Sequence, residues 1–319
     1  MDIGILGALD MRENGVSVTP TAPKPRQVLA LLALHADRPV TVGTLTEELW
    51  GHRPPRSARP TLQTYVMQLR ELLAPALEGS GDSTGARTAK QVLRTVPGGY
   101  LLDSGDGTSD VREFERLAGA GYRAMEAGDP RETARLLRAA LALWRGPALA
   151  DVPAGEQLRT EIRALEESRL CALDRRIEAD LRLGRHRELI AELTVLVGRH
   201  PTHESLCAQL MTALHRSGRR SEALDAYQRL RTTLVRDLGL EPSAALGKVR
   251  QAVLTAPADD TTHDSTAAGN ADTPDFTAAG VGRPDFTAGQ GGRPGVSAAD
   301  AGPPGVTVPG VTESIGRDG

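Results

Sequence analysis

The sequence Arg56-Ser-Ala-Arg-Pro-Thr-Leu-Gln-Thr-Tyr-Val-Met-Gln-Leu-Arg70 decides the fold of this protein. It predicts a helix over residues 61–73, because apolar side chains recur at spacings of four, three and four residues, at Leu62, Val66, Leu69 and Leu73. The opposite side of this helix carries Gln63, Thr64, Met67 and Gln68. Amides and hydroxyls there can hydrogen-bond the edges of DNA bases, while arginines can bind guanine or phosphate. Taken alone, the segment also fits an ordinary amphipathic helix on a protein surface.

The segments around this helix predict a DNA-binding fold. Residues 26–35 are expected to form a compact apolar helix, and residues 42–50 a second one that stops at Gly51, where glycine can adopt a left-handed conformation. A pair of prolines then makes a stiff, exposed connection to the next helix. After that helix, residues 92–102 are expected to form a hairpin with a Gly-Gly turn. Helix, turn, helix, loop, helix and hairpin is the order of a winged helix-turn-helix.

Two short strands are expected ahead of these helices, over residues 3–9 and 15–19, with a turn at Glu13-Asn14-Gly15. We therefore assign residues 1–102 to a winged helix domain. The chain is long enough for a second domain with its own core.

The middle of the chain, residues 103–255, is predicted to be helical throughout. Apolar residues recur every three or four positions over residues 110–127, 130–144, 155–183, 186–199, 202–217 and 221–238. Two similar turns begin at Gly184 and Gly218, 34 residues apart, which is the period of a tetratricopeptide helix pair. Helices paired at that period stack into a superhelix whose concave face commonly binds protein. A plain helical bundle with two similar turns is the alternative.

Beyond residue 255 the composition changes. Thr273-Pro-Asp-Phe-Thr-Ala-Ala-Gly-Val-Gly282 is followed by Arg283-Pro-Asp-Phe-Thr-Ala-Gly-Gln-Gly-Gly292, which makes a ten-residue repeat that decays toward the end. A segment rich in Gly, Pro, Ala, Thr and Asp buries too little apolar area to offset the entropy of ordering. We expect residues 256–319 to be a disordered tail. The expected fold class is therefore mainly α with a small β component.

The net charge of −3 becomes informative once it is divided along the chain. Residues 1–102 carry 11 Lys/Arg and 9 Asp/Glu, whereas residues 256–319 carry 3 and 9, so the acidity belongs to the tail. Residues 53–70 contain four arginines and no acidic residue. Positive charge is thus concentrated beside the helix expected to bind DNA.

Several other classes of protein find no support in the sequence. No apolar run reaches the roughly 18 residues of a membrane span, and no signal-peptide pattern opens the chain. Cys171 and Cys207 lie on predicted apolar helices and are expected to be free thiols of a reducing cytoplasm. We find no phosphate-binding loop, nucleophile elbow or catalytic dyad. We expect no enzymatic activity, no metal ion and no cofactor.

A family resemblance rests on the winged and helical segments together. The strand pair, three helices and Thr95-Val-Pro-Gly-Gly-Tyr100 wing resemble the OmpR-type winged helix. Continued into a helical region with Leu141-Ala-Leu-Trp-Arg-Gly146, the chain resembles the Streptomyces antibiotic regulatory protein family from residue 1 to about 255. That family joins an OmpR-type DNA-binding domain to a bacterial transcriptional activator domain. Further stretches carry the resemblance, among them Trp50-Gly51, His200-Pro-Thr-His-Glu204, Gly218-Arg-Arg-Ser-Glu-Ala-Leu224 and Leu238-Gly-Leu-Glu-Pro242.

Residue roles follow from the winged fold. The side chains expected to read base edges are Arg59, Gln63, Thr64 and Gln68. Those expected to contact the DNA backbone are Arg56, Thr61, Arg70, Arg94 and Thr95. The resemblance implies that the loop before the helix touches RNA polymerase, with its sigma factor as the partner, through His52 and Arg53.

The resemblance further implies an activator that binds direct repeats in promoters of secondary-metabolite (antibiotic) gene clusters, as a dimer on double-stranded DNA. Such a protein works in the cytoplasm, at the nucleoid. The alternative is a tetratricopeptide-like adaptor, whose winged helix no longer binds DNA and instead contacts protein. The intact arginines of residues 53–70 favour the activator.

Overall fold

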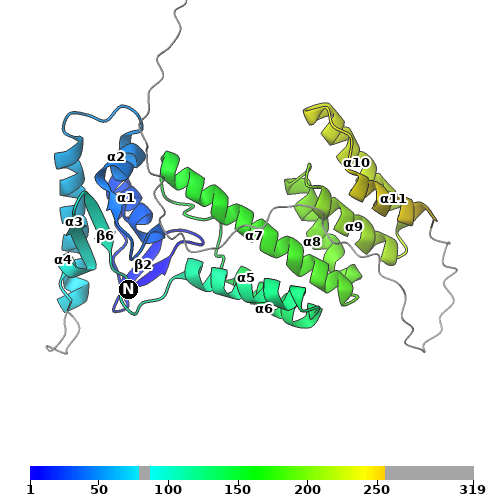
Figure 1. Cartoon of the computed structure of the whole chain (residues 1–319), viewed down its shortest axis with the longest axis horizontal. Coiled ribbons are helices and arrows are strands. Elements are labelled where there is room, and N and C mark those ends of the chain that lie inside the picture. The colour runs from blue at the N-terminus through cyan, green and yellow to red at the C-terminus, as the bar shows by residue number, and fades with distance from the viewer. Residues whose placement is uncertain (79–86, 256–319) are drawn as a thin grey trace, which may run out of the picture. The chain divides into compact units, whose positions relative to one another are not determined.

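The structure is a computed structural model that describes residues 1–78 and 87–255 (Figure 1). Its first half has the element order of a winged helix. The elements are β1 (Asp2–Gly4), β2 (Asp10–Glu13), β3 (Val16–Ser17), α1 (Pro23–Leu34), β4 (Val40–Thr41), α2 (Val42–Trp50), α3 (Ala58–Glu78), α4 (Ala89–Val92), β5 (Leu93–Val96) and β6 (Gly99–Leu102). The winged helix expected from the sequence is therefore confirmed.

Two small antiparallel sheets complete the winged helix. One has the order β1-β2-β3, and the other has the order β4-β6-β5, so that the wing hairpin gains a third strand. In that second sheet Val40 pairs with Tyr100, and Thr41 pairs with Gly99. A Cβ atom on Gly99 would lie 2.1 Å from the Val40 carbonyl oxygen. Only glycine therefore lets β4 approach the wing so closely.

The second half consists of helices, as expected. They are α5 (Asp110–Glu126), α6 (Pro130–Ala142), α7 (Glu156–Arg182), α8 (His186–Arg199), α9 (Glu204–Arg216), α10 (Arg220–Leu238) and α11 (Ala244–Thr255). The two similar turns have matching geometry, with Gly184 at φ 80° and Gly218 at φ 78°. In each, the amide after the glycine donates to a carbonyl five residues earlier. This bond closes the preceding helix and starts the next one.

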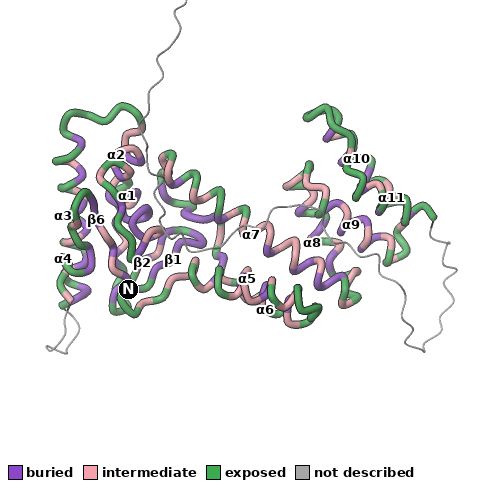
Figure 2. Tube along the Cα trace, viewed as in Figure 1, coloured by how far each residue is buried: buried purple, intermediate pink, exposed green. Residues whose placement is uncertain are grey.

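Two hydrophobic cores hold these elements (Figure 2). The first draws its residues from the whole winged helix and from α5, α6 and the first part of α7, as far as Ala172. Trp144 lies in this core, edge-on to Phe114 with ring centroids 5.6 Å apart. The second core runs from Ile177 to Val253. The first core contains residues from both sides of position 102, so the two predicted domains pack against each other there. The division of the chain at this position stays a prediction.

Several details differ from the sequence-based expectations. The first strand ends at Gly4 because the amides of Ile5 and Leu6 donate to the Asp110 carboxylate instead of to another strand. The strand β2 and the helix α11 were not expected. The helix over residues 61–73 is longer than expected and continues through Pro75, because Ala76 and Leu77 beyond it are buried.

Two expectations about other parts of the chain remain. The disordered tail expected over residues 256–319 lies outside the described residues. None of the helices within residues 1–78 and 87–255 combines the length and the hydrophobicity that a membrane span requires.

Candidate DNA-binding interface

The helix α3 has one buried face and one exposed face. The apolar stripe of Leu62, Val66, Leu69 and Leu73 is buried in the first core, which confirms the orientation expected from its spacing. Gln63, Thr64 and Gln68 are exposed on the other side, together with Met67, whose exposed fraction is 53%. The polar side chains are thus presented to solvent by a helix whose position is fixed by packing.

Not all of these polar groups are equally available. The Thr64 hydroxyl donates to the Pro60 carbonyl oxygen at 3.1 Å, so this side chain offers a methyl group and an acceptor rather than a donor. No hydrogen bond engages the amides of Gln63 and Gln68 within the part of the chain that the structure describes. Each of these side-chain amides therefore keeps its N–H donors and its oxygen acceptor available for an external partner. Thr61 is half-buried at the start of the exposed face.

Three arginines precede and begin this face. Arg53, Arg56 and Arg59 are exposed, and none forms an ion pair with another described residue. Arg59 lies four residues before Gln63, one turn earlier on the same side of α3. Uncompensated guanidinium groups attract phosphate, and their binding to DNA releases the counterions that surround it.

The loop between α2 and α3 begins at Gly51, which has φ 62° and donates its amide to the Glu47 carbonyl oxygen at 2.7 Å. His52 and Arg53 follow, and both are exposed. The loop thus leaves α2 at a fixed angle and presents its side chains outward.

The wing is tied to α3 by Arg70. Its Nε and Nη2 atoms donate to the Leu93 carbonyl oxygen at 3.0 and 2.8 Å, and Nη2 also donates to the Thr95 hydroxyl at 2.8 Å. Sequence reasoning assigned Arg70 and Thr95 to the DNA backbone and did not foresee that they bind each other. Arg94 lies between Leu93 and Thr95 on β5. Its side chain is exposed and has no ion pair with another described residue.

A buried carboxylate, which the sequence analysis did not identify, joins α2 to the start of α7. Glu48 has an exposed fraction of 2%, and its oxygens accept from the amides of Gly155 at 2.6 Å and Leu158 at 3.0 Å. It also accepts from Gln27 Nε2 at 2.6 Å. A Cβ atom on Gly155 would lie 2.1 Å from the Glu48 carbonyl oxygen, so the contact requires glycine. The start of α7 is therefore capped by the helix that leads into the exposed loop.

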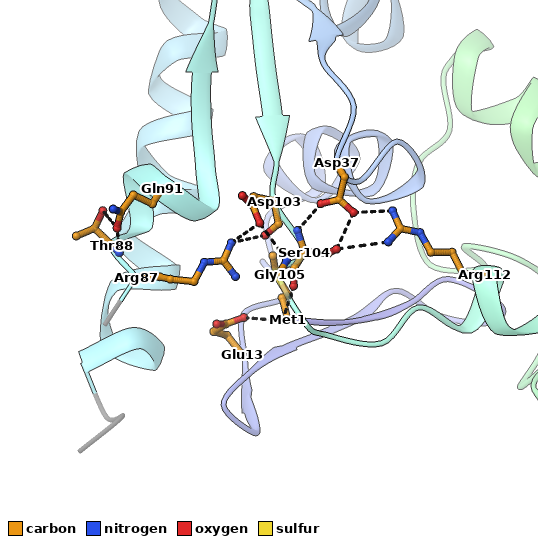
Figure 3. Close-up of polar contacts among 10 residues, drawn as sticks. All are labelled: Met1, Glu13, Asp37, Arg87, Thr88, Gln91, Asp103, Ser104, Gly105 and Arg112. Atoms are coloured by element: carbon orange, nitrogen blue, oxygen red, sulfur yellow. Dashed lines mark hydrogen bonds and ion pairs between the residues drawn. The ribbon is translucent and has the colours of Figure 1, made fainter. Parts of the chain in front are cut away.

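A second group of hydrogen bonds, centred on Asp37, joins the base of the wing to α5 (Figure 3). Asp37 accepts from the amide and hydroxyl of Ser104 at 2.8 Å each, and from Arg112 Nη2 at 2.7 Å. Burial alone would raise the pKa of Asp37, but these hydrogen bonds outweigh it and leave the pKa below its usual value. Asp37 is thus charged at neutral pH and holds Ser104, just beyond β6, against the turn after α1.

Other reactive side chains do not assemble into a site. No group of three or more His, Cys, Asp or Glu side chains in the described residues is placed to hold a metal ion. Burial raises the pKa of the Cys207 thiol to about 12, so this cysteine is a poor nucleophile. The exposed face of α3, the loop before it and the wing therefore form the candidate DNA-binding interface.

Both parts of the chain match known protein families. Residues 17–99 match the family described as transcriptional regulatory protein, C terminal, and residues 109–254 match the bacterial transcriptional activator domain. The regulatory protein DnrI of Streptomyces peucetius is 53% identical over 256 residues, which cover 80% of this chain and 93% of that protein. The transcriptional regulator RedD of Streptomyces coelicolor is 35% identical, over 80% of this chain and 70% of that protein.

The fold also matches a solved structure. The structure of EmbR from Mycobacterium tuberculosis superposes with a TM-score of 0.71 at 38% sequence identity. The match covers 79% of this chain and 64% of the EmbR chain, so this chain spans less than two thirds of that protein.

Proposed function

Because the chain belongs to the Streptomyces antibiotic regulatory protein family, we propose that it activates transcription of a secondary-metabolite (antibiotic) biosynthetic gene cluster. It does so by binding direct repeats in promoters, as a dimer on double-stranded DNA, and by recruiting RNA polymerase. It works in the cytoplasm at the nucleoid and catalyses no reaction of its own.

The observation that carries this proposal is the contrast between the two sides of α3. One side is buried in the core, while the other presents two unengaged amides, with exposed arginines at its start. Side chains of these types recognise bases in the major groove. Joined to a bacterial transcriptional activator domain, such a helix supports sequence-specific activation better than a structural role.

Individual contacts are proposed as follows. Gln63 and Gln68 read base edges with their amides, Thr64 contacts a base with its methyl group or oxygen, and Arg59 binds guanine. The backbone contacts are proposed for Arg56, Thr61, Arg70, Arg94 and Thr95. For Arg70 the contact uses Nη1, because Nε and Nη2 already donate to the wing.

Two measurements on the full chain test the proposal. A gel shift with DNA upstream of neighbouring biosynthetic genes should show binding that a direct-repeat competitor removes and a scrambled competitor does not. In vitro transcription from the same DNA should rise when the protein is added. If no upstream sequence were bound, the tetratricopeptide-like adaptor would become the better interpretation.

The polymerase contact is proposed for the loop between α2 and α3, through His52 and Arg53. Both side chains are exposed, and folding alone does not explain them. The double variant His52→Ala/Arg53→Ala should keep promoter affinity within a few-fold while transcription falls sharply. Arg56 and Arg59 stay intact in this variant because they are assigned to DNA. Parallel loss of binding and transcription would mean that the loop serves DNA binding instead.

A further inference from the structure

Two pockets in the helical region lie away from the DNA-binding face. One has a volume of about 480 Å³ and is formed by α6 and the turn between α7 and α8. Four arginines line it: Arg131, Arg135, Arg138 and Arg185. The other has a volume of about 360 Å³ and is formed by α6, α7 and α8. Its walls include Leu141, Leu173, Val195, Leu196 and Arg199.

An ion-pair network connects the two pockets. Arg138 and Arg185, which line the first pocket, each donate to the buried Asp180 carboxylate at 2.9 Å. Arg176 also binds Asp180, at 3.3 Å, and reaches on to Glu192, which lines the second pocket. The pockets are therefore neighbours along α7, flanked by α6 and α8. We call this pair of pockets the α6–α8 groove.

The groove combines unpaired positive charge with an apolar surface. Of its lining arginines, Arg131 and Arg199 have no ion pair within the described residues. Arg199 ends α8, whereas Arg131 lines the pocket at the start of α8, so these two charges lie at opposite ends of the groove. Between them Val195 has an exposed fraction of 53%, which is high for an apolar side chain with no partner.

We propose that the α6–α8 groove binds an acidic peptide segment of a partner protein. Leucine or phenylalanine side chains of the peptide pack on Leu141, Leu173 and Val195, and carboxylates pair with Arg131 and Arg199. The 14 residues of α8 set the length of the groove at about 20 Å, because a helix rises about 1.5 Å per residue. An extended peptide covers that length with about six residues, so its acidic residues are separated by about that number.

Charge and polarity both favour a peptide over nucleic acid. The other lining arginines are engaged in ion pairs: Arg135 binds Glu132, Arg169 binds Glu166, and Arg138 and Arg185 share the Asp180 carboxylate with Arg176. Two separated cations above an apolar floor suit a short segment with few carboxylates. A nucleic acid backbone needs a continuous run of uncompensated cations.

A selection experiment identifies the ligand chemistry without knowledge of the partner. A phage library of random 12-residue peptides is selected on the full-length protein, with depletion on the variant Arg131→Glu/Arg199→Glu. We expect enriched peptides to be acidic and to contain Leu or Phe between the acidic residues. A fluorescein-labelled enriched peptide is then titrated by anisotropy. Its Kd should rise at least tenfold with Arg131→Glu/Arg199→Glu and with Val195→Asp.

Controls separate the groove from general charge and from folding. Arg229→Glu reverses one exposed arginine on α10 outside both pockets and should leave the Kd within about twofold. All substituted positions are exposed, so circular dichroism melts and promoter binding should be unchanged. Enrichment of neutral or basic peptides would overturn the proposal, as would unchanged affinity in the groove variants. Weakened binding of a random 20-base-pair duplex by Arg131→Glu/Arg199→Glu would instead assign the groove to nucleic acid.

Discussion

The arginines at the proposed DNA-binding face differ from those at the junction between the winged helix and the helices after it. At the face, Arg53, Arg56 and Arg59 are exposed and have no ion pair among the described residues. At the junction, Arg112 binds Asp37 at 2.7 Å and Arg145 binds Asp110 at 3.0 Å. An arginine paired within the protein fixes geometry but has little net charge to offer. The unpaired ones keep their charge for an external anion, which we propose is DNA, and add little to folding.

Carboxylates show the same division. The face from residue 53 to residue 70 contains none. At the junction, Glu48 and Asp110 accept hydrogen bonds from backbone amides and hold segments that are distant in sequence. Substitutions at the junction should therefore change stability, and substitutions at the face should change DNA affinity.

The largest effect is expected at Glu48. Glu48→Ala leaves the amides of Gly155 and Leu158 without an acceptor and removes one of the two acceptors of Gln27 Nε2, which still donates to the backbone carbonyl oxygen of residue 48. Each unsatisfied buried donor costs about 1–3 kcal/mol. We expect the free energy of unfolding to fall by about 3 kcal/mol or more. Urea unfolding followed by tryptophan fluorescence measures it, because Trp50 and Trp144 both pack in the first core. Glu47→Ala, one residue earlier, should cost under about 1 kcal/mol. Similar losses for both variants would contradict the anchoring role of Glu48.

A smaller effect, on DNA rather than on stability, is expected at Gln63. Gln63→Ala should weaken binding to the cognate site by about 1–3 kcal/mol and reduce the preference over random DNA. Its melting temperature should stay unchanged because the side chain has no described partner. Binding titrations on cognate and random duplexes measure the preference. An unchanged preference would remove Gln63 from the reading face.

Arg70 lies between the two classes. Arg70→Ala removes three hydrogen bonds between α3 and the wing, so unfolding should become easier by about 1 kcal/mol. If Nη1 also binds phosphate, affinity should fall equally for all sequences and the salt slope should decrease by about one. Arg94→Ala is the matched control, and it should change only DNA affinity. Lost stability with an unchanged salt slope would make Arg70 a structural residue alone.

The smallest effect is expected from Asp37 in acid. Because the folded pKa of Asp37 lies below its unfolded value near 3.8, its charged form stabilises the fold above that value, and this contribution disappears as pH falls through the folded pKa. The difference in melting temperature between the protein and Asp37→Asn should be constant from about pH 5 to 7 and shrink below about pH 4. A difference that did not depend on pH would show that the carboxylate charge is not what matters.

The sequence predicted the parts of the fold that depend on local patterns. The apolar stripe of α3, the Gly-Gly turn of the wing and the helix His186–Arg199 follow from spacing within about ten residues. The hydrogen bonds of Glu48 and Asp37 were not predictable in this way. Glu48 lies 107 residues from Gly155, and Asp37 lies 75 residues from Arg112. An acidic residue in a helix pattern normally indicates a solvated position, and nothing near Glu48 in sequence reveals its acceptor role.

The candidate site divides along the same line. The exposure of Gln63, Thr64 and Gln68 was predictable, because these residues lie on the side of α3 opposite the buried apolar stripe. The bond from Arg70 to Thr95 was not, because it depends on how β5 packs beside α3. Which bases these side chains contact depends on the docking of DNA, and their roles in recognition stay predictions.

The Glu48–Gly155 contact bears on how regulators of this kind can be recombined. A chimaera that takes residues 1–102 from one relative and the remainder from another separates this carboxylate from the glycine that it approaches, unless both parents supply them. Any larger residue at position 155 would collide with the main chain of α2. If the exposed residues of α3 read DNA as proposed, grafting them alone transfers DNA specificity without disturbing this contact, whereas exchanging whole winged helices breaks it. Where a whole exchange is needed, the crossover belongs after Leu158, so that the cap of α7 travels with the helix that it binds.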